Sequence, residues 1–245
     1  MKTYRFFTAI LMVALSFNLV SCGDDENESG ITNNSEKRLI KIELYEAYNQ
    51  NNHEYCGDIK YEYDGNKISR IISSIYDEYN TYEIGEKEIT VWDTEKNEIS
   101  STYTLNDNGY IQSSTLGIKY NYYSDGYLKS LESGNEIYVY SYDKEWNLIK
   151  TSDIPNILYT DKIQNKGNLF IWDGLAGSGR PDIDILASVG FFGKTPKYLL
   201  QRFDYGDNDS DLYEYELDKD GYVEQTRITI DNQSFVYKYT YENTK

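Results

Sequence analysis

In residues 122–128 the sequence reads Tyr-Tyr-Ser-Asp-Gly-Tyr-Leu, a polar turn between two aromatic segments. Aspartate hydrogen-bonds to its own backbone and glycine supplies a positive φ, so such a cluster reverses the direction of the chain. Tyrosine and leucine on either side suit a pleated sheet with two different faces. We therefore interpret this stretch as a β-hairpin.

The hairpin pattern repeats at a nearly constant spacing. The strands that enter the turns close at positions 63, 84, 105, 123 and 142, which lie 18 to 21 residues apart. This period holds two strands and two turns, so the sequence predicts an antiparallel up-and-down meander. We expect the turns at the opposite end near 77–80, 93–97, 116–117 and 133–135. Copies of the pattern stand at 61–68, 103–111, 122–128, 140–148 and 215–223, and residues 84–87 provide a further, degenerate copy.

The meander is long for an open sheet. Continued to the C-terminus it gives roughly fifteen strands, and a strongly twisted sheet of that size curls. We predict an all-β fold, a curved sheet or an incomplete barrel, in a single domain over 38–245. A membrane-spanning barrel is disfavoured, because tyrosines alternate with polar residues, as in 118–122, and leave no unbroken apolar band.

One segment, near 181–190, interrupts the meander. It begins with a proline, which suits the first helical position, and Ile185, Leu186 and Val189 form an apolar stripe. Gly190 favours a C-terminal stop. We predict a short helix that plugs or covers one end of the curled sheet, anchored by the two phenylalanines that follow.

The N-terminus has the order of a secretory signal. Lys2 and Arg5 precede an apolar run that is too short to span a hydrocarbon core of roughly 30 Å. The run ends in Leu-Val-Ser-Cys, which resembles the lipobox of bacterial lipoproteins, whose cysteine is lipidated and becomes the mature N-terminus. We predict a signal peptide over 1–21 and a lipidated Cys22 that anchors the protein in a lipid bilayer. An ordinary cleaved signal is the alternative.

Residues 22–37 are acidic and polar and show no apolar periodicity, which predicts a flexible tether. An acidic run directly after the lipidated cysteine resembles the export signal of lipoproteins displayed on the surface of some Gram-negative bacteria. We expect an outer-membrane lipoprotein, periplasmic or surface-exposed, with the surface favoured. A solvated linker without an export role is the alternative.

Charge and cysteine content exclude several classes of function. The chain has 24 basic and 41 acidic side chains, a formal charge of −17, and loss of residues 1–21 removes two basic groups and no acid. This balance argues against nucleic-acid binding, which depends on Lys and Arg. With Cys22 lipidated, Cys56 has no disulfide partner, and together with the single His53 it offers too few ligands for zinc or thiol chemistry.

The Tyr-x-Tyr-Asp-x-x-Gly-x-Leu character of the hairpins resembles the repeats of bacterial YD-repeat proteins. Over most of the mature chain, the Tyr-rich hairpins and the segment Phe-Phe-Gly-Lys-Thr-Pro-Lys-Tyr-Leu at 191–199 look like a bacterial envelope lipoprotein family of unknown function with a porin-like fold. The resemblance implies a fold and an envelope location. It implies no activity and no catalytic residues.

Aromatic residues are the leading candidates for binding. The chain has 27 tyrosines and 3 tryptophans, and amphipathic rings of this kind stack on sugars or form protein-binding faces. We select Trp92, Trp146, Tyr122 and Tyr140 as candidate ligand-binding residues. The alternative is that these aromatics only pack the sheet, since they are ordinary strand formers.

Two further motifs are weaker. Asp207, Asp209 and Asp211 stand at alternate positions, like the start of a calcium loop, and would hold at most a weak structural calcium. The glycine and the bidentate glutamate of an EF-hand loop do not follow, which favours a solvated acidic turn. The glycine-rich stretch 174–180 lacks the Lys-Ser/Thr of a phosphate loop and is typical of a flexible crossover.

The sequence singles out no pair of carboxylates and no positioned nucleophile, so we expect no catalytic residues and no cofactor. We predict a membrane-anchored, non-enzymatic binding or accessory lipoprotein of the bacterial cell envelope, with a glycan or an envelope protein as its partner. A structural or assembly component without a ligand is the alternative, and a hydrolase is less favoured.

Overall fold

A computed structural model describes residues 37–49, 52–75, 78–169, 181–206, 209–230 and 233–244. The predicted signal peptide, Cys22, nearly all of the tether and the glycine-rich stretch 174–180 lie outside the described residues. The elements are β1 (Lys37–Asn49), β2 (Asn52–Asp64), β3 (Lys67–Ser73), β4 (Asn80–Ile84), β5 (Glu88–Asp93), β6 (Glu98–Leu105), β7 (Ile111–Ser114), β8 (Ile118–Tyr122), β9 (Leu128–Ser133), β10 (Glu136–Val139), β11 (Ser141–Tyr142), β12 (Leu148–Lys150), β13 (Asn156–Gln164), α1 (Pro181–Ala187), β14 (Tyr198–Gly206), β15 (Asp209–Leu217), β16 (Val223–Ile230) and β17 (Gln233–Asn243).

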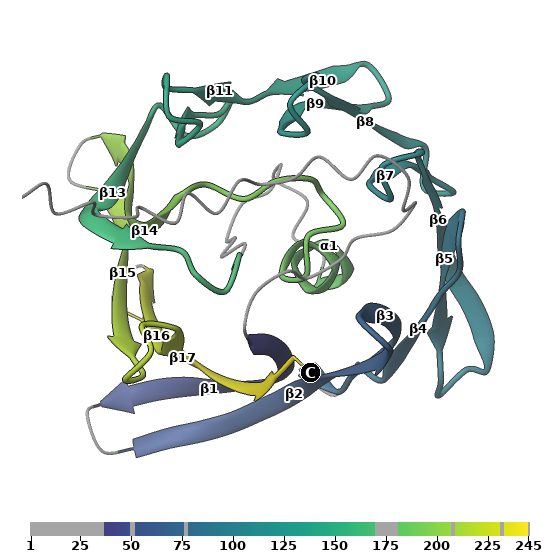
Figure 1. The fold of residues 1–245 in the computed structure, drawn as a ribbon, viewed down its shortest axis with the longest axis horizontal. Helices are drawn as coiled ribbons and strands as arrows, with labels where there is room; N and C mark the ends of the chain where they lie inside the picture. The colour runs from purple at the N-terminus through teal and green to yellow at the C-terminus, as the bar shows by residue number, and fades with distance from the viewer. Residues whose placement is uncertain are drawn as a thin grey trace, which may run out of the picture.

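The strands form the predicted meander. Fifteen of them pair in one antiparallel sheet in the order β10-β9-β8-β7-β6-β5-β4-β3-β2-β1-β17-β16-β15-β14-β13. The first and last strands of the chain, β1 and β17, pair with each other. Figure 1 shows the sheet curled into a ring. The predicted incomplete barrel is confirmed.

The ring is not closed by hydrogen bonds between β10 and β13, the two edge strands of the sheet. The separate pair β11–β12 lies between them (Figure 1). Side chains bridge the remaining space, because the N–H of Val139 donates to Ser152 Oγ at 2.8 Å and the N–H of Leu148 donates to Tyr159 Oη at 3.1 Å. The short pair therefore occupies the gap without completing the sheet.

Alternation along each strand separates an apolar inner face from a polar outer face. In β8, Ile118 and Tyr120 are buried while Lys119 and Asn121 are exposed. The inward side chains of most strands join a single apolar core inside the ring. The period of two in the sequence therefore fixes which face of the curled sheet meets water.

The predicted helix is present as α1, and it lies inside the ring (Figure 1). Ile185, Leu186 and Phe192 are at most 2% exposed, and the ring of Phe192 packs edge-on against Tyr120 at 5.0 Å between centroids. Gly190 ends the helix with a positive φ of 89°, which lets Phe191 N–H reach back to the Leu186 carbonyl. The helix and the phenylalanines fill the ring, in agreement with the prediction, and we call the segment from α1 to Lys194 the plug. Among the described residues, no helix has the length and the hydropathy needed to cross a membrane.

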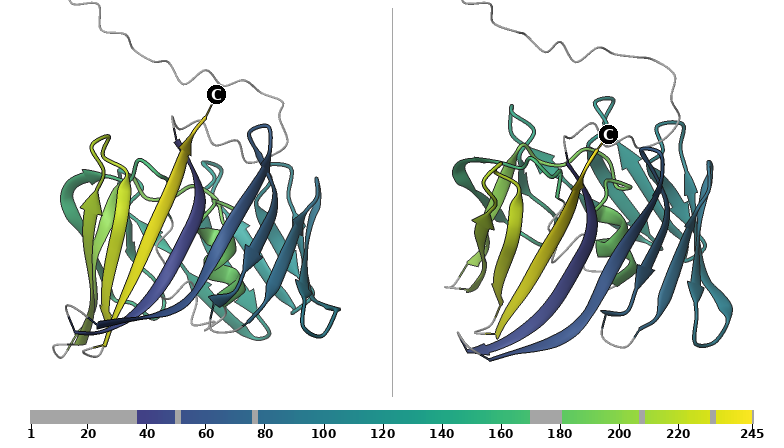
Figure 2. Two further views of the ribbon diagram at one scale, coloured as in Figure 1. Left: turned by 90° about the horizontal axis from the view of Figure 1, so that it is seen from below. Right: turned by 60° about the horizontal axis from the view of Figure 1, so that its bottom comes forward.

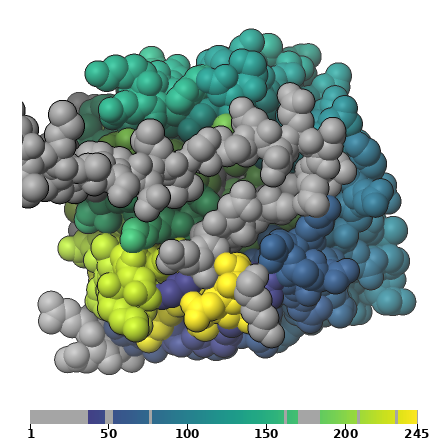
Figure 3. Space-filling model, in the orientation of Figure 1, coloured from purple at the N-terminus to yellow at the C-terminus, as the bar shows by residue number. Residues whose placement is uncertain are grey.

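The tight turns of the repeat lie at one end of the ring, which we call the turn end. Residue 37, where β1 begins, and residue 243, where β17 ends, lie at the same end because the strands are antiparallel. Figure 2 shows this end uppermost, with the C-terminus marked. In the space-filling view down the ring, described strands border the molecule at the top, right and bottom (Figure 3).

Candidate functional site

Four hairpin turns at the turn end share one backbone geometry. In each, the first residue donates its N–H to the carbonyl of the fifth, and the fourth donates to the carbonyl of the first, with N···O distances of 2.8 to 3.2 Å. The fourth residue has a positive φ in every copy, between 62° and 87°. That residue is Gly109, Gly126 and Gly221 in three turns, and Trp146 in the other.

Trp146 therefore holds a conformation that favours glycine. A left-handed conformation costs a residue with a Cβ about 1–2 kcal/mol. Asp143 holds the turn in place, since its carboxylate accepts hydrogen bonds from the N–H groups of Glu145 (2.8 Å) and Asn147 (2.9 Å). Burial would raise the pKa of Asp143, but the hydrogen bond from the Asn147 side chain at 3.0 Å, together with the two backbone bonds, outweighs it and the pKa is lowered. A strained residue kept in this way points to a role for its side chain.

The side chain of Trp146 completes an aromatic group that we call the rim cluster, formed by Tyr123, Tyr127, Tyr142 and Trp146. The rings of Tyr127 and Trp146 are parallel within 4° and 4.5 Å apart between centroids. Tyr123 and Tyr142 lie 5.6 and 5.7 Å from Trp146 and meet it at 62° and 57°. All four side chains are partly exposed, so two neighbouring hairpins together present aromatic surface to solvent.

A cavity of about 320 Å³ adjoins the rim cluster, and we call it the rim cavity. It lies between the hairpin turns and the plug, and Tyr127 belongs to both the cavity wall and the rim cluster. Its volume falls in the range of small-ligand sites, which combine aromatic walls with a few polar groups. Its lining includes Asn66, Tyr110, Tyr127, Asn168 and Lys194.

Of the four predicted aromatic residues, Trp146 alone belongs to the rim cluster. Trp92 lies on β5, where its Nε1–H donates to Glu83 at 3.3 Å. Tyr140 is 0% exposed and packs in the core. Tyr122 is mostly buried beneath the cavity wall: it packs on Tyr110 at 5.3 Å between ring centroids, and its hydroxyl donates to the Ile111 carbonyl at 2.6 Å.

Sequence reasoning missed Tyr110, Tyr127 and Lys194. A signal for the first two is present in the repeat, because the residue after the left-handed glycine is tyrosine in three copies, at 110, 127 and 222. Two of these tyrosines, Tyr110 and Tyr127, line the rim cavity. The position after the left-handed glycine could therefore have identified them in the sequence. Lys194 has no such signal, because it belongs to the plug and not to a hairpin.

The predicted calcium ligands are only partly described. Asp207 lies outside the described residues, and Asp209 is at the exposed start of β15. Asp211 is 5% exposed, and its carboxylate accepts a hydrogen bond from Tyr205 Oη at 2.7 Å. Within the described ranges no three His, Cys, Asp or Glu side chains are grouped as metal ligands would be. Calcium binding here stays a prediction.

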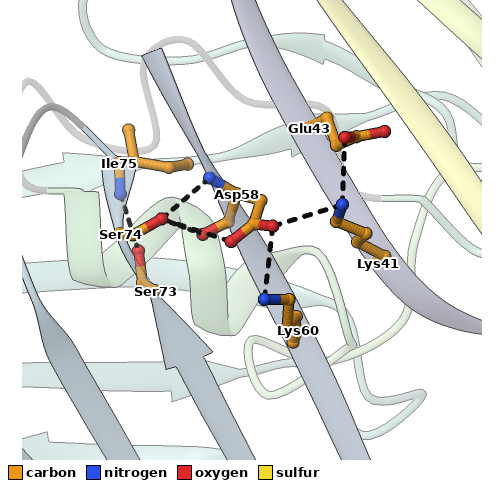
Figure 4. Close-up of polar contacts among 7 residues, drawn as sticks. All are labelled: Lys41, Glu43, Asp58, Lys60, Ser73, Ser74 and Ile75. Atoms are coloured by element: carbon orange, nitrogen blue, oxygen red, sulfur yellow. Dashed lines mark hydrogen bonds and ion pairs between the residues drawn. The ribbon is translucent and has the colours of Figure 1, made fainter. Parts of the chain in front are cut away.

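A second polar site, which we call the Asp58 cluster, lies across β1, β2 and the end of β3 (Figure 4). The Asp58 carboxylate pairs with Lys41 at 3.2 Å and Lys60 at 3.5 Å, and accepts a hydrogen bond from Ser74 Oγ at 3.2 Å. Burial alone would raise the pKa of Asp58, but Lys41, Lys60 and Ser74 together lower it. Each charge has a partner, so the cluster ties strands together.

Gly57, beside the Asp58 cluster, permits a close crossing of the backbone. It has a φ of 132°, and a Cβ there would overlap the Ser74 carbonyl and stand 2.6 Å from the Ile75 Cα. Cys56, the preceding residue, is a half-buried free thiol, and burial raises its pKa. A raised pKa disfavours the nucleophilic thiolate.

No family model matches the sequence, and no curated protein matches it significantly. Among solved structures, a porin-like protein from Bacteroides uniformis ATCC 8492 is similar, with a TM-score of 0.63 and 17% sequence identity. The match covers 86% of this chain and 99% of that chain. At this identity the likeness shows the fold alone, and it supports the expected porin-like architecture.

Proposed function

We propose that this chain is a non-enzymatic binding lipoprotein of the outer membrane, anchored through a lipidated Cys22, which binds a glycan at the turn end. The observation that carries the proposal is Trp146, held in a glycine's conformation and stacked on Tyr127 beside the rim cavity. A conformation that costs free energy is retained where the side chain serves a purpose.

Sugar rings suit this surface. Their apolar faces pack on flat aromatic side chains, and their hydroxyls need polar groups nearby. The rim cluster offers aromatic faces, while Asn66 and Asn168 place amide-bearing side chains at the adjoining cavity. The formal charge of −17 makes an anionic membrane surface a poor partner, so anchoring is assigned to lipid and binding to the aromatic site.

A structural or assembly component without a ligand is the competing function. It is favoured by the aromatic residues that only pack the core, such as Tyr82, Tyr103 and Tyr140, which are all 0% exposed. The two functions make different predictions for the partly exposed aromatics of the rim cluster. Only a binding protein needs them for anything beyond stability.

A glycan array with purified protein tests the proposal. We compare the natural chain with Trp146→Gly. This variant removes the indole and places in the turn the same residue, glycine, that the three sister turns have at this position. Trp92→Ala is the matched control, since it removes a tryptophan from β5. Binding that is lost in Trp146→Gly and kept in Trp92→Ala supports the proposal. Absence of binding across broad neutral and acidic glycans would favour the structural role.

The anchor has its own test. Radiolabelled palmitate should enter the natural chain and should not enter Cys22→Ala, and the unlabelled variant should leave the membrane fraction. Protease treatment of intact cells separates a surface position from a periplasmic one. Membrane retention of Cys22→Ala would contradict the lipid anchor without affecting the binding proposal.

A further inference from the structure

The charge at the rim cavity differs from that of the chain as a whole. Acidic side chains outnumber basic ones by 41 to 24 in the sequence. Among the described residues that line the rim cavity, none is acidic and one, Lys194, is basic. The described lining of the cavity thus carries one positive charge and no negative one, whereas the chain as a whole is strongly negative.

Lys194 is directed to this place by its backbone. Its N–H donates to the Gly126 carbonyl at 2.9 Å, which joins the plug to the turn between β8 and β9. A Cβ at Gly126 would stand 3.1 Å from Tyr110 Oη and 3.6 Å from Lys194 Cε. Gly126 thus leaves space in which the lysine stem and the tyrosine hydroxyl come close together.

Two cations at the start of β1, also at the turn end, are paired with carboxylates. Lys37 pairs with Asp218 at 2.7 Å and with Asp220 at 2.5 Å, and Arg38 pairs with Glu242 at 2.6 Å. No carboxylate among the described residues pairs with the ammonium group of Lys194, whose side chain is exposed. Within the described part of the chain, no carboxylate competes with a negatively charged ligand for this ammonium group.

We infer that the rim cavity binds a uronic acid residue of an acidic glycan, with its carboxylate on Lys194 Nζ. The sugar ring packs on the tyrosine wall formed by Tyr110 and Tyr127, and its hydroxyls face Asn66 and Asn168. The inference rests on the proposed function, because it assigns the class of glycan that the turn end recognises.

Distance decides between this local attraction and the repulsion from the rest of the protein. At physiological ionic strength, charges more than about 8 Å apart are largely screened when they are exposed to solvent. A carboxylate on Lys194 Nζ therefore interacts only weakly with exposed acids that lie farther away than this. A hydrogen bond between two ionised groups is also stronger than one between neutral groups.

The experiment compares matched glycans on the purified protein. Fragments of galacturonan, alginate, hyaluronan and chondroitin are each paired with the same fragment after its carboxyl groups are reduced to alcohols, and binding is measured by calorimetry. Lys194→Gln removes the charge of the cavity. Lys219→Gln, in the exposed turn between β15 and β16, removes a lysine that does not line it.

We expect at least one acidic fragment to bind about tenfold more tightly than its reduced form, the effect of one charged hydrogen bond. Lys194→Gln should remove that difference, and Lys219→Gln should preserve it. Equal binding of acidic and reduced forms, no effect of Lys194→Gln, or binding of neutral glycans only would overturn the inference and leave the proposed function standing. If no glycan of either kind binds, the proposed function fails, and the inference fails with it.

Discussion

At the Asp58 cluster a positive φ belongs to Gly57, because backbone atoms leave no room for a Cβ there. At the rim cluster a positive φ belongs to Trp146, although three sister turns use glycine in the same place. In the first region packing explains why glycine is present. In the second, tryptophan occupies a left-handed conformation that favours glycine. The contrast separates a site built for stability from a site that keeps a costly side chain.

Gly57→Ala should have the largest effect on stability. The new methyl group would overlap the Ser74 carbonyl, and the residue would keep a φ of 132° that side chains rarely adopt. We expect the free energy of unfolding to fall by about 3 kcal/mol or more, measured by chemical denaturation. Gly65→Ala is the matched control, because its φ is also positive but nothing lies within 4 Å of the new Cβ. A loss no larger than that of the control would contradict the packing role of Gly57.

Asp58→Asn should have the next largest effect, and it should depend on pH. The folded-state pKa of Asp58 is lowered, so its contribution is present above the unfolded pKa and is lost as the pH falls through the folded pKa. We expect the variant to be less stable by about 1–2 kcal/mol at neutral pH. The difference between variant and natural chain should shrink as the pH falls below about 4, the ordinary aspartate range. A pH-independent difference would indicate that shape, not charge, matters at this position.

Two substitutions of Trp146 separate strain from packing. Trp146→Ala keeps the left-handed strain and loses the contact with Tyr127, whereas Trp146→Gly loses both. We expect Trp146→Gly to be more stable than Trp146→Ala by about 1 kcal/mol, and both to show weaker glycan binding. If alanine is as stable as glycine here, then the turn carries no strain, and the main support for the proposed site is removed.

Lys60→Gln should have the smallest effect. Its ammonium group is 3.5 Å from Asp58 and its side chain is 57% exposed, so water and salt screen the pair. We expect a change below about 0.5 kcal/mol in the free energy of unfolding. A larger loss, comparable with that of Asp58→Asn, would mean that Lys60 rather than Lys41 is the main partner of the carboxylate.

The fold follows from the sequence because its signals are local. Asp, Asn and Gly at the turns and a period of two between them specify each hairpin, and neighbouring hairpins then pair in order. The helix at Pro181–Ala187 was equally predictable, since proline, an apolar stripe and Gly190 lie within ten residues.

The candidate site was predictable only in part. Trp146 stands out as a rare residue in the sequence, but only the structure gives its left-handed φ of 62°. Tyr122 and Tyr140 are also aromatic residues near hairpin turns, yet Tyr122 is mostly buried and Tyr140 is fully buried in the core. Lys194 reaches the rim cavity because the plug, 68 residues after Gly126, returns to the inside of the ring. Such a contact between distant segments has no local pattern.

The pairing of β1 with β17 also affects the order in which the molecule forms. Lys37 is opposite Asn243, so the first described strand lacks one of its two neighbours until β17 has been made. Pairings between residues so far apart in sequence close large loops and fold slowly. A chain that ends before the 11 residues of β17 would leave β1 and β16 as open edges, which pair readily with other chains. Pairing of β17 with β1 and β16 is thus the step that covers these two edges.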